Sequence, residues 1–212
     1  MSHIAICVPT EGLVEAGFAF DLAKAVGWHG INHPEDVIHL TSMSGSILSA
    51  QRQGMMKEAI ENGADFVIQI DSDMRFPPQT FAQLVGHDEP FVAANCSKRR
   101  LPLGPTAFRV GDGELEPVMP NPEVNGLEEV YVVGFGVACI RKDVFLQIAW
   151  PWVDNPWLDQ EQHHMGEDTF FCKRLRDAEI PVLIDHGLSW HIRHCGTVGF
   201  GMPDLLGMPN GS

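Results

Sequence analysis

The segment 63–78 constrains this sequence more than any other. Residues 66–70 form an apolar run typical of a buried β-strand, and the run ends abruptly at Asp71-Ser-Asp73. The prolines at 77–78 then prevent further extended pairing. In open α/β sheets, ligands bind beyond the carboxyl ends of the strands, which is where this acidic pair is expected. Two carboxylates at this spacing can approach one hard cation such as Mg²⁺, although the same triplet is also an ordinary polar turn.

Strands and helices are predicted to alternate around this segment. Strands are expected at 3–8 and 37–40, and amphipathic helices at 13–26 and 47–61, where Ser44 or Ser46 caps the second helix. This βαβαβ spacing predicts parallel strands, right-handed crossovers and helices on both faces of a sheet. No G-x-G-x-x-G sequence follows the first strand, so an ordinary dinucleotide-binding fold is disfavoured.

The second half of the sequence is more irregular. Further strands are expected at 91–94, 129–133, 137–140, 181–184 and 188–192. Further helices are expected at 78–85, 142–148 and 167–178. Loops with short strands are expected at 101–127, and an irregular loop is expected at 150–166. Together these elements predict a single domain over 1–196, followed by a flexible Gly/Pro-rich tail over 197–212.

Net charge, cysteine spacing and the length of the apolar stretches narrow the class of protein. The formal net charge of −14 argues against a general nucleic-acid binder, but it permits a local site for a phosphorylated small molecule that contains a metal or a few arginines. The five cysteines are widely spaced and form no CxxC pair, which favours free thiols in a reducing compartment. The N-terminus lacks a signal-peptide pattern, and the longest apolar stretch, 130–140, contains two glycines and is too short to span a bilayer. A cytoplasmic protein is therefore expected.

Two further groups of residues carry chemistry. Glu167 and Asp168 open a predicted helix, where the helix dipole favours anions. They form either a stabilising acidic first turn or a general base with an acceptor-orienting partner. His191 lies near the end of the last predicted strand and His194 follows it, and either one can supply imidazole to the metal of the acidic pair. Mixed carboxylate and imidazole ligands shift the expected ion from Mg²⁺ toward Mn²⁺.

The order and spacing of these motifs resemble a known family. The motifs are Asp71-Ser-Asp73 after a βαβαβ unit, Gly134-Phe-Gly136 between two strands, Gly166-Glu-Asp168 at the start of a helix, and His194-Cys-Gly196. Their combination is similar to that of GT-A-fold glycosyltransferases, especially the family-2-like bacterial and viral branch, and it spans roughly residues 4–196. The resemblance implies an α/β, Rossmann-like GT-A fold with a mixed, mostly parallel central sheet flanked by helices.

The resemblance also implies a function, namely the metal-dependent transfer of a hexose-type sugar from a nucleotide-diphospho-sugar, UDP-type by expectation, to an acceptor hydroxyl. Asp73 would hold Mn²⁺ in preference to Mg²⁺, with Asp71 sharing the ion or contacting the donor. His194 would be a further ligand, with His191 as the alternative. Asp168 would be the base of an inverting reaction or a positioning group in a retaining one, and Glu167 would bind hydroxyl groups.

The remaining implied residues bind the donor. They are Pro9, Thr10 and Glu11 after the first strand, Arg52 in the second helix, Asp71 and Ser72, and Gly134 and Gly136. Arg52 can equally belong to a solvated helix face. The basic cluster 97–100 either neutralises phosphate charge or is a solvated surface.

Three other functions share parts of the pattern. A sugar-nucleotide nucleotidyltransferase would have a Gly-rich, basic loop after the first strand, but here residues 9–15 are acidic. An aspartyl-phosphate phosphatase would have its Asp-x-Asp motif on the first strand, but here the motif follows the third. A non-catalytic nucleotide-sugar binder with the same fold stays open.

Overall fold

The computed structural model describes residues 1–99, 102–196 and 200–201. The helices in this part of the chain are α1 (Ala16–Asn32), α2 (Leu48–Glu61), α3 (Thr80–Gly86), α4 (Val144–Gln147), α5 (Glu167–Asp177) and α6 (His186–Ser189). The strands of the main sheet are β1 (His3–Thr10), β2 (Val37–Ser44), β3 (Phe66–Ile70), β5 (Phe91–Ala93), β8 (Leu127–Glu129), β9 (Val137–Arg141) and β12 (Leu183–Asp185). The shorter strands are β4 (Met74–Arg75), β6 (Phe108–Gly111), β7 (Glu114–Pro117), β10 (Trp157–Leu158), β11 (His163–His164), β13 (Arg193–His194) and β14 (Phe200–Gly201).

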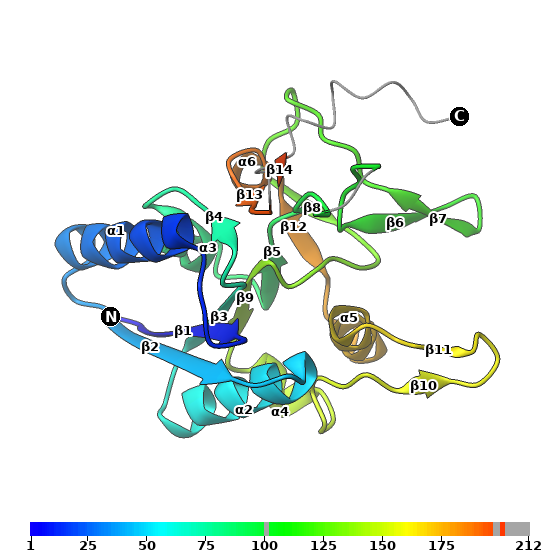
Figure 1. The fold of residues 1–212 in the computed structure, drawn as a ribbon, viewed down its shortest axis with the longest axis horizontal. Helices are drawn as coiled ribbons and strands as arrows, with labels where there is room; N and C mark the ends of the chain where they lie inside the picture. The colour runs from blue at the N-terminus through cyan, green and yellow to red at the C-terminus, as the bar shows by residue number, and fades with distance from the viewer. Residues whose placement is uncertain (100–101, 197–199, 202–212) are drawn as a thin grey trace.

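One seven-stranded sheet with the order β2-β1-β3-β9-β5-β12-β8 organises the molecule (Figure 1). Strand β1 pairs in parallel with β2 and β3, and β5 pairs in parallel with β12. Strand β9 runs antiparallel between β3 and β5, and β8 runs antiparallel to β12. The predicted α/β class, with a mixed, mostly parallel sheet flanked by helices, is confirmed.

Apolar side chains cover both faces of the sheet. In β1, Ala5 and Cys7 point into a core shared with α2 and α5, whereas Ile4 and Ile6 point into a second core shared with α1, α3 and α6. In Figure 1, α1 and α3 lie on one side of the sheet and α2 and α4 on the other. A strand buried on both faces reads as a continuous apolar run, which is why β1 and β3 were detectable in the sequence.

Phe171 shows how α5 depends on its core. Its ring is fully buried and packs 5.1 Å from the ring of Phe135 and 5.7 Å from that of Phe91, measured between centroids. We expect Phe171→Ala to lower the free energy of unfolding by about 3–5 kcal/mol, measured by urea denaturation. The control Leu146→Ala, at a side chain that is 86% exposed, should change it by less than about 0.5 kcal/mol. Equal losses in the two variants would contradict this assignment of the core.

Helix α1 is longer than predicted. It continues past Gly27, the predicted end, to Asn32. It ends at Asn32, where the backbone N–H of His33 donates to the carbonyl of His29 at 2.7 Å and Pro34 follows. The predicted serine cap of α2 is wrong, since Ile47 precedes this helix and β2 extends to Ser44.

The predicted strand at 188–192 is also wrong. This segment begins within the short helix α6, because the carboxylate of Asp185 accepts a hydrogen bond from the N–H of Leu188 at 2.9 Å and so caps a helical turn. The strand predicted at 129–133 lies earlier in the chain, because β8 ends at Glu129. Of the residues that follow, only Val132 forms an isolated β-bridge, with Phe108. The segment 150–166, predicted as a loop, contains the β10–β11 hairpin.

The end of the chain is only partly described. The predicted tail at 197–212 lies outside the described residues except for Phe200–Gly201, which form β14 beside β13. Within the described part of the chain, no helix combines the length and apolar character needed to cross a membrane. The β6–β7 and β10–β11 hairpins both extend toward the right of Figure 1, away from β2 and α1.

Candidate functional site

A cavity of about 550 Å³ lies at the carboxyl ends of β1, β2 and β3. Parallel neighbouring strands end at the same edge of a sheet, so the loops that leave them converge there. The loops are tied together, since the N–H of Gly45 donates to the carbonyl of Thr10 at 3.2 Å and that of Glu15 donates to the carbonyl of Ser72 at 3.0 Å. Arg99 and His194 complete the lining from more distant parts of the chain.

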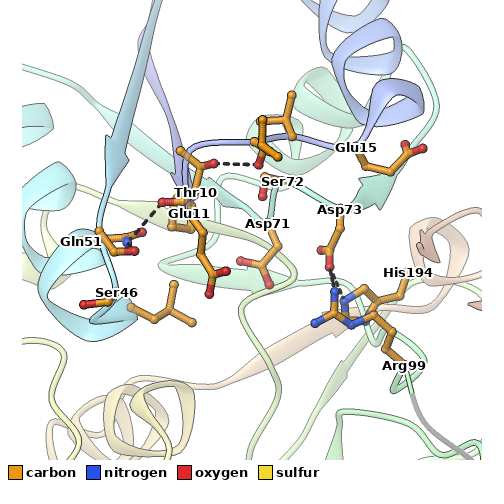
Figure 2. A pocket seen from close by; sticks show the side chains of 15 residues that line it. Thr10, Glu11, Glu15, Ser46, Gln51, Asp71, Ser72, Asp73, Arg99 and His194 are labelled. Atoms are coloured by element: carbon orange, nitrogen blue, oxygen red, sulfur yellow. Dashed lines mark hydrogen bonds and ion pairs between the residues drawn. The ribbon is translucent and has the colours of Figure 1, made fainter. Parts of the chain in front are cut away.

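The two ends of the cavity differ in chemistry. Figure 2 shows Asp73, His194 and Arg99 gathered at one end and Gln51 at the other, with Asp71 between them. The wall also includes three apolar side chains from the exits of β1 and β2, which are Leu13, Val14 and Leu48. The cavity therefore offers apolar contact as well as an ionic end.

Asp73 and His194 face each other across a strand pairing. Strand β13 pairs antiparallel with β4, which sets His194 opposite Met74 and next to Asp73. The His194 Nε2 atom lies 3.3 Å from Asp73 Oδ2, and the same carboxylate oxygen pairs with the guanidinium of Arg99 (Figure 2). The His194 Nδ1 atom lies 3.1 Å from the carbonyl oxygen of Ser97. Because a carbonyl only accepts, Nδ1 carries a proton and Nε2 is the atom turned toward Asp73.

Each member of this pair shifts the pKa of the other toward its charged form. Burial raises the pKa of Asp73, but the hydrogen bond and charge of His194 and the charge of Arg99 outweigh it, so the pKa lies below its ordinary value. Burial lowers the pKa of His194, but Asp73 and the Ser97 carbonyl reverse this effect and raise the pKa above its ordinary value. This end of the cavity thus keeps a carboxylate ionised and stabilised by positive charge.

The Asp73–His194 pair also fits one divalent ion. Adjacent octahedral ligands at about 2.1 Å from an ion lie roughly 3 Å apart, close to the observed separation. A metal-bound histidine usually donates its other ring N–H to a carbonyl or carboxylate, as His194 does to Ser97.

Asp71 stands apart from this pair. Among the described residues, the one group of three ligand-type side chains whose atoms all lie within 4.8 Å is His33, Glu35 and Asp36, which precedes β2 at the opposite end of that strand from the cavity. Because Asp71 forms no such group with Asp73 and His194, its carboxylate would have to move to share their ion.

Several predicted site residues lie behind the cavity and not in its wall. They are Arg52, Gly134, Gly136, Glu167 and Asp168. The carbonyl of Gly136 accepts a hydrogen bond from the N–H of Asp71 at 3.0 Å. A Cβ atom at Gly134 would lie 3.5 Å from Asp168 Oδ2. The motifs at 71–73, 134–136 and 166–168 are therefore neighbours in space.

Asp168 is a partly buried carboxylate in the first turn of α5. Its Oδ1 atom accepts a hydrogen bond from the N–H of Thr169 at 2.6 Å. Burial raises the pKa of Asp168, and the negative charge of Glu167 raises it further, while Thr169 and Arg52 offset these effects only in part. A buried carboxylate with a raised pKa is typical of a general base.

Sequence reasoning missed part of the cavity wall. Gln51 was not among the predicted residues, yet its Nε2 donates to the carbonyls of Gly45 at 2.6 Å and Thr10 at 3.3 Å. The only signal in the sequence was the position of its partners, since Thr10 and Gly45 lie at the ends of the first two strands, at the same edge of the sheet. His191, the predicted alternative to His194, lies outside this cavity and lines a smaller one of about 120 Å³ beside Trp190.

Solved structures share this architecture. The structure of A197 from STIV is 16% identical, covers 96% of this chain and 91% of its own, and superposes with a TM-score of 0.62. The chain has a GT-A-like fold. At this identity the likeness concerns the fold alone.

Two other structures are similar at lower scores. A mutant of the Drosophila beta-1,4-galactosyltransferase 7, in complex with manganese, UDP-Gal and xylobiose, is 12% identical with a TM-score of 0.46, over 87% of this chain and 65% of that one. A Desulfovibrio desulfuricans G20 protein, provisionally named a nucleotide-diphospho-sugar transferase, is 13% identical with a TM-score of 0.41, over 87% of this chain and 80% of that one. No protein-family model and no curated protein matches the sequence.

Proposed function

We propose that this protein is a metal-dependent glycosyltransferase that moves a hexose-type sugar from a nucleotide-diphospho-sugar to an acceptor hydroxyl. The observation that carries the proposal is the Asp73–His194 pair, whose ligand atoms are 3.3 Å apart at one end of a cavity that also contains apolar side chains. A nucleoside diphosphate combines the same two kinds of surface, since it joins a flat, largely apolar base to a dense negative charge.

The cavity can accommodate such a donor in one direction. The base would lie against the apolar side chains Leu13 and Leu48, and the ribose near Thr10 and Glu11. The diphosphate would then reach the ionic end, where Arg99 offsets its charge. UDP is the expected nucleotide, following the resemblance in the sequence.

The residues present divide the chemistry between them. When bound by Asp73 and His194, a divalent ion, Mn²⁺ in preference to Mg²⁺ because imidazole is a ligand, would act as a Lewis acid on the leaving diphosphate. Asp168 would take the proton from the acceptor hydroxyl as the bond to the sugar forms. Asp168 is partly buried beside Gly134, and this burial raises the pKa of its carboxyl group.

The cavity disfavours the competing nucleotidyltransferase reaction. That reaction requires a nucleoside triphosphate, whose extra charge needs basic groups in the first loop. Here the β1–α1 loop contributes two acidic side chains, Glu11 and Glu15, to the cavity wall. Like charges in a partly enclosed site repel, so a triphosphate would bind poorly.

Thermal unfolding of the intact chain with nucleoside diphosphates tests the proposal. We expect one of UDP, GDP, ADP or CDP to raise the melting temperature with Mn²⁺ but not with EDTA. A ligand at 100 times its dissociation constant stabilises the native state by about 2.7 kcal/mol. Equal shifts with and without chelator, or no shift with any nucleotide, would refute the proposal.

Two histidine variants sharpen this test. His194→Ala removes a proposed ligand, so we expect the Mn²⁺-dependent shift to disappear. His191→Ala changes an exposed histidine three residues away that lies outside the cavity, so the shift should remain. Loss of the shift in both variants, or in neither, would rule out His194 as a specific ligand.

A further inference from the structure

Arg52 is the largest fully buried side chain among the described residues. It extends from the second turn of α2, and its side chain is only 2% exposed. Removing a charge from water costs several kcal/mol unless partners of opposite charge compensate for it. A buried arginine is therefore informative about the groups that surround it.

The partners of Arg52 come from three separate elements. Its Nη2 atom lies 2.7 Å from Asp71 Oδ1, at the end of β3, and its Nε atom lies 3.5 Å from Glu167 Oε1, at the start of α5. Its Nη1 atom lies 3.4 Å from Gln69 Oε1. The guanidinium also lies over the ring of Phe135, at 5.1 Å from the centroid, in the turn before β9.

This arrangement joins the two halves of the proposed site. Asp71 belongs to the donor half and lines the cavity, whereas Glu167 adjoins Asp168 in the acceptor half. Arg52 itself does not line the cavity, so it is not placed to contact a donor directly. Without its charge, two carboxylates would face the same poorly solvated space, and their repulsion would push them apart.

We propose that Arg52 is a positioning residue that fixes Asp71 and the Glu167–Asp168 turn in one geometry beneath the donor. This inference rests on the proposed glycosyltransferase function, because it assigns the two carboxylates to the two halves of that reaction. Rates of group transfer depend steeply on such alignment, and a displacement of about 1 Å can cost roughly 100-fold. Arg52 thus acts through its neighbours and not on the substrate.

Three variants of the intact chain separate this role from a purely structural one. Arg52→Lys keeps the charge but loses the fork that reaches both carboxylates. Arg52→Met combined with Glu167→Gln removes one positive and one negative charge together, so no unpaired charge is left between these two positions. This double variant is used if Arg52→Lys alone prevents folding. Lys57→Met removes a positive charge from the exposed face of the same helix and is the control.

The readout is release of nucleoside diphosphate from the nucleotide sugar that stabilises the wild type, with Mn²⁺. We expect kcat to fall about 100-fold in Arg52→Lys and in the double variant, with KM within about threefold of wild type. Both variants should still unfold in a cooperative thermal transition. Lys57→Met should match the wild type. Wild-type kcat in both Arg52 variants would overturn the inference. It would also be overturned if kcat in the double variant rose in proportion to its thermal stability, because the loss would then follow from unfolding alone.

The failure of the proposed function looks different. A wild-type chain without metal-dependent nucleotide binding overturns that function, and this inference with it, before any variant is measured. A wild type that binds and turns over while the Arg52 variants do the same overturns the inference alone.

Discussion

Asp73→Ala is expected to abolish sugar transfer and Mn²⁺-dependent nucleotide binding while the fold persists. Asp73 pairs with His194 and Arg99 at the ionic end of the cavity, so its loss removes the carboxylate of the proposed metal site. Lewis-acid stabilisation of a leaving phosphate contributes several kcal/mol, and each 1.36 kcal/mol is tenfold in rate. We expect kcat/KM to fall at least about 1,000-fold, measured by nucleotide release.

The stability of this variant should change little. Asp73 is partly exposed, and its backbone carbonyl, which accepts from the N–H of Cys195 at 2.8 Å, remains. Exposed ion pairs contribute about 0–1 kcal/mol, so the urea midpoint should move only slightly. Asp112→Ala, which removes one negative charge from the exposed β6–β7 turn, is the control and should keep full activity. Full activity in Asp73→Ala would eliminate this carboxylate as a metal ligand.

The central fold was predictable because its signals are local. The strand at 66–70 is fully buried and was read with the correct bounds, since apolar residues followed by Asp71-Ser-Asp73 leave few alternatives. Helix boundaries were less predictable. Gly27 lies on an open face of α1, and its cost of about 1 kcal/mol relative to alanine does not end the helix there. The turn at α6 depends on the capping carboxylate of Asp185, which an apolar run does not reveal.

The sequence indicated which residues gather near the site, but not which of them are buried beneath it. The sequence order predicted the residues at the three strand ends, which any parallel sheet brings to one edge. The sequence did not predict that Arg52 is buried beneath Asp71, because its two carboxylate partners lie 19 residues and over a hundred residues away in the chain. Likewise, only the β4–β13 pairing distinguishes His194 from His191.

Asp168→Asn is the second change with a large expected effect. If Asp168 accepts the proton of the acceptor hydroxyl, the amide cannot replace it, and loss of a general base costs typically 10²–10⁴-fold in rate. Nucleotide binding with Mn²⁺ should remain, because Asp168 does not line the cavity. Thermal shifts and initial rates on the same samples measure both properties. Asp177→Asn, at an exposed carboxylate on the same helix, is the matched control and should keep wild-type values.

The raised pKa of Asp168 determines the direction of two further effects, on the pH dependence of the rate and on stability. Burial and the charge of Glu167 lift the pKa above the ordinary value of 3.8, so the wild-type rate should fall with decreasing pH at a higher pH than an exposed aspartate would produce. Glu167→Gln removes one cause and should move this acidic limb to lower pH. A raised carboxyl pKa costs stability once pH exceeds the unfolded-state value, so Asp168→Asn should unfold at a higher temperature than wild type near pH 7. A variant that is both less stable and fully active would show that Asp168 has a structural role and not a catalytic one.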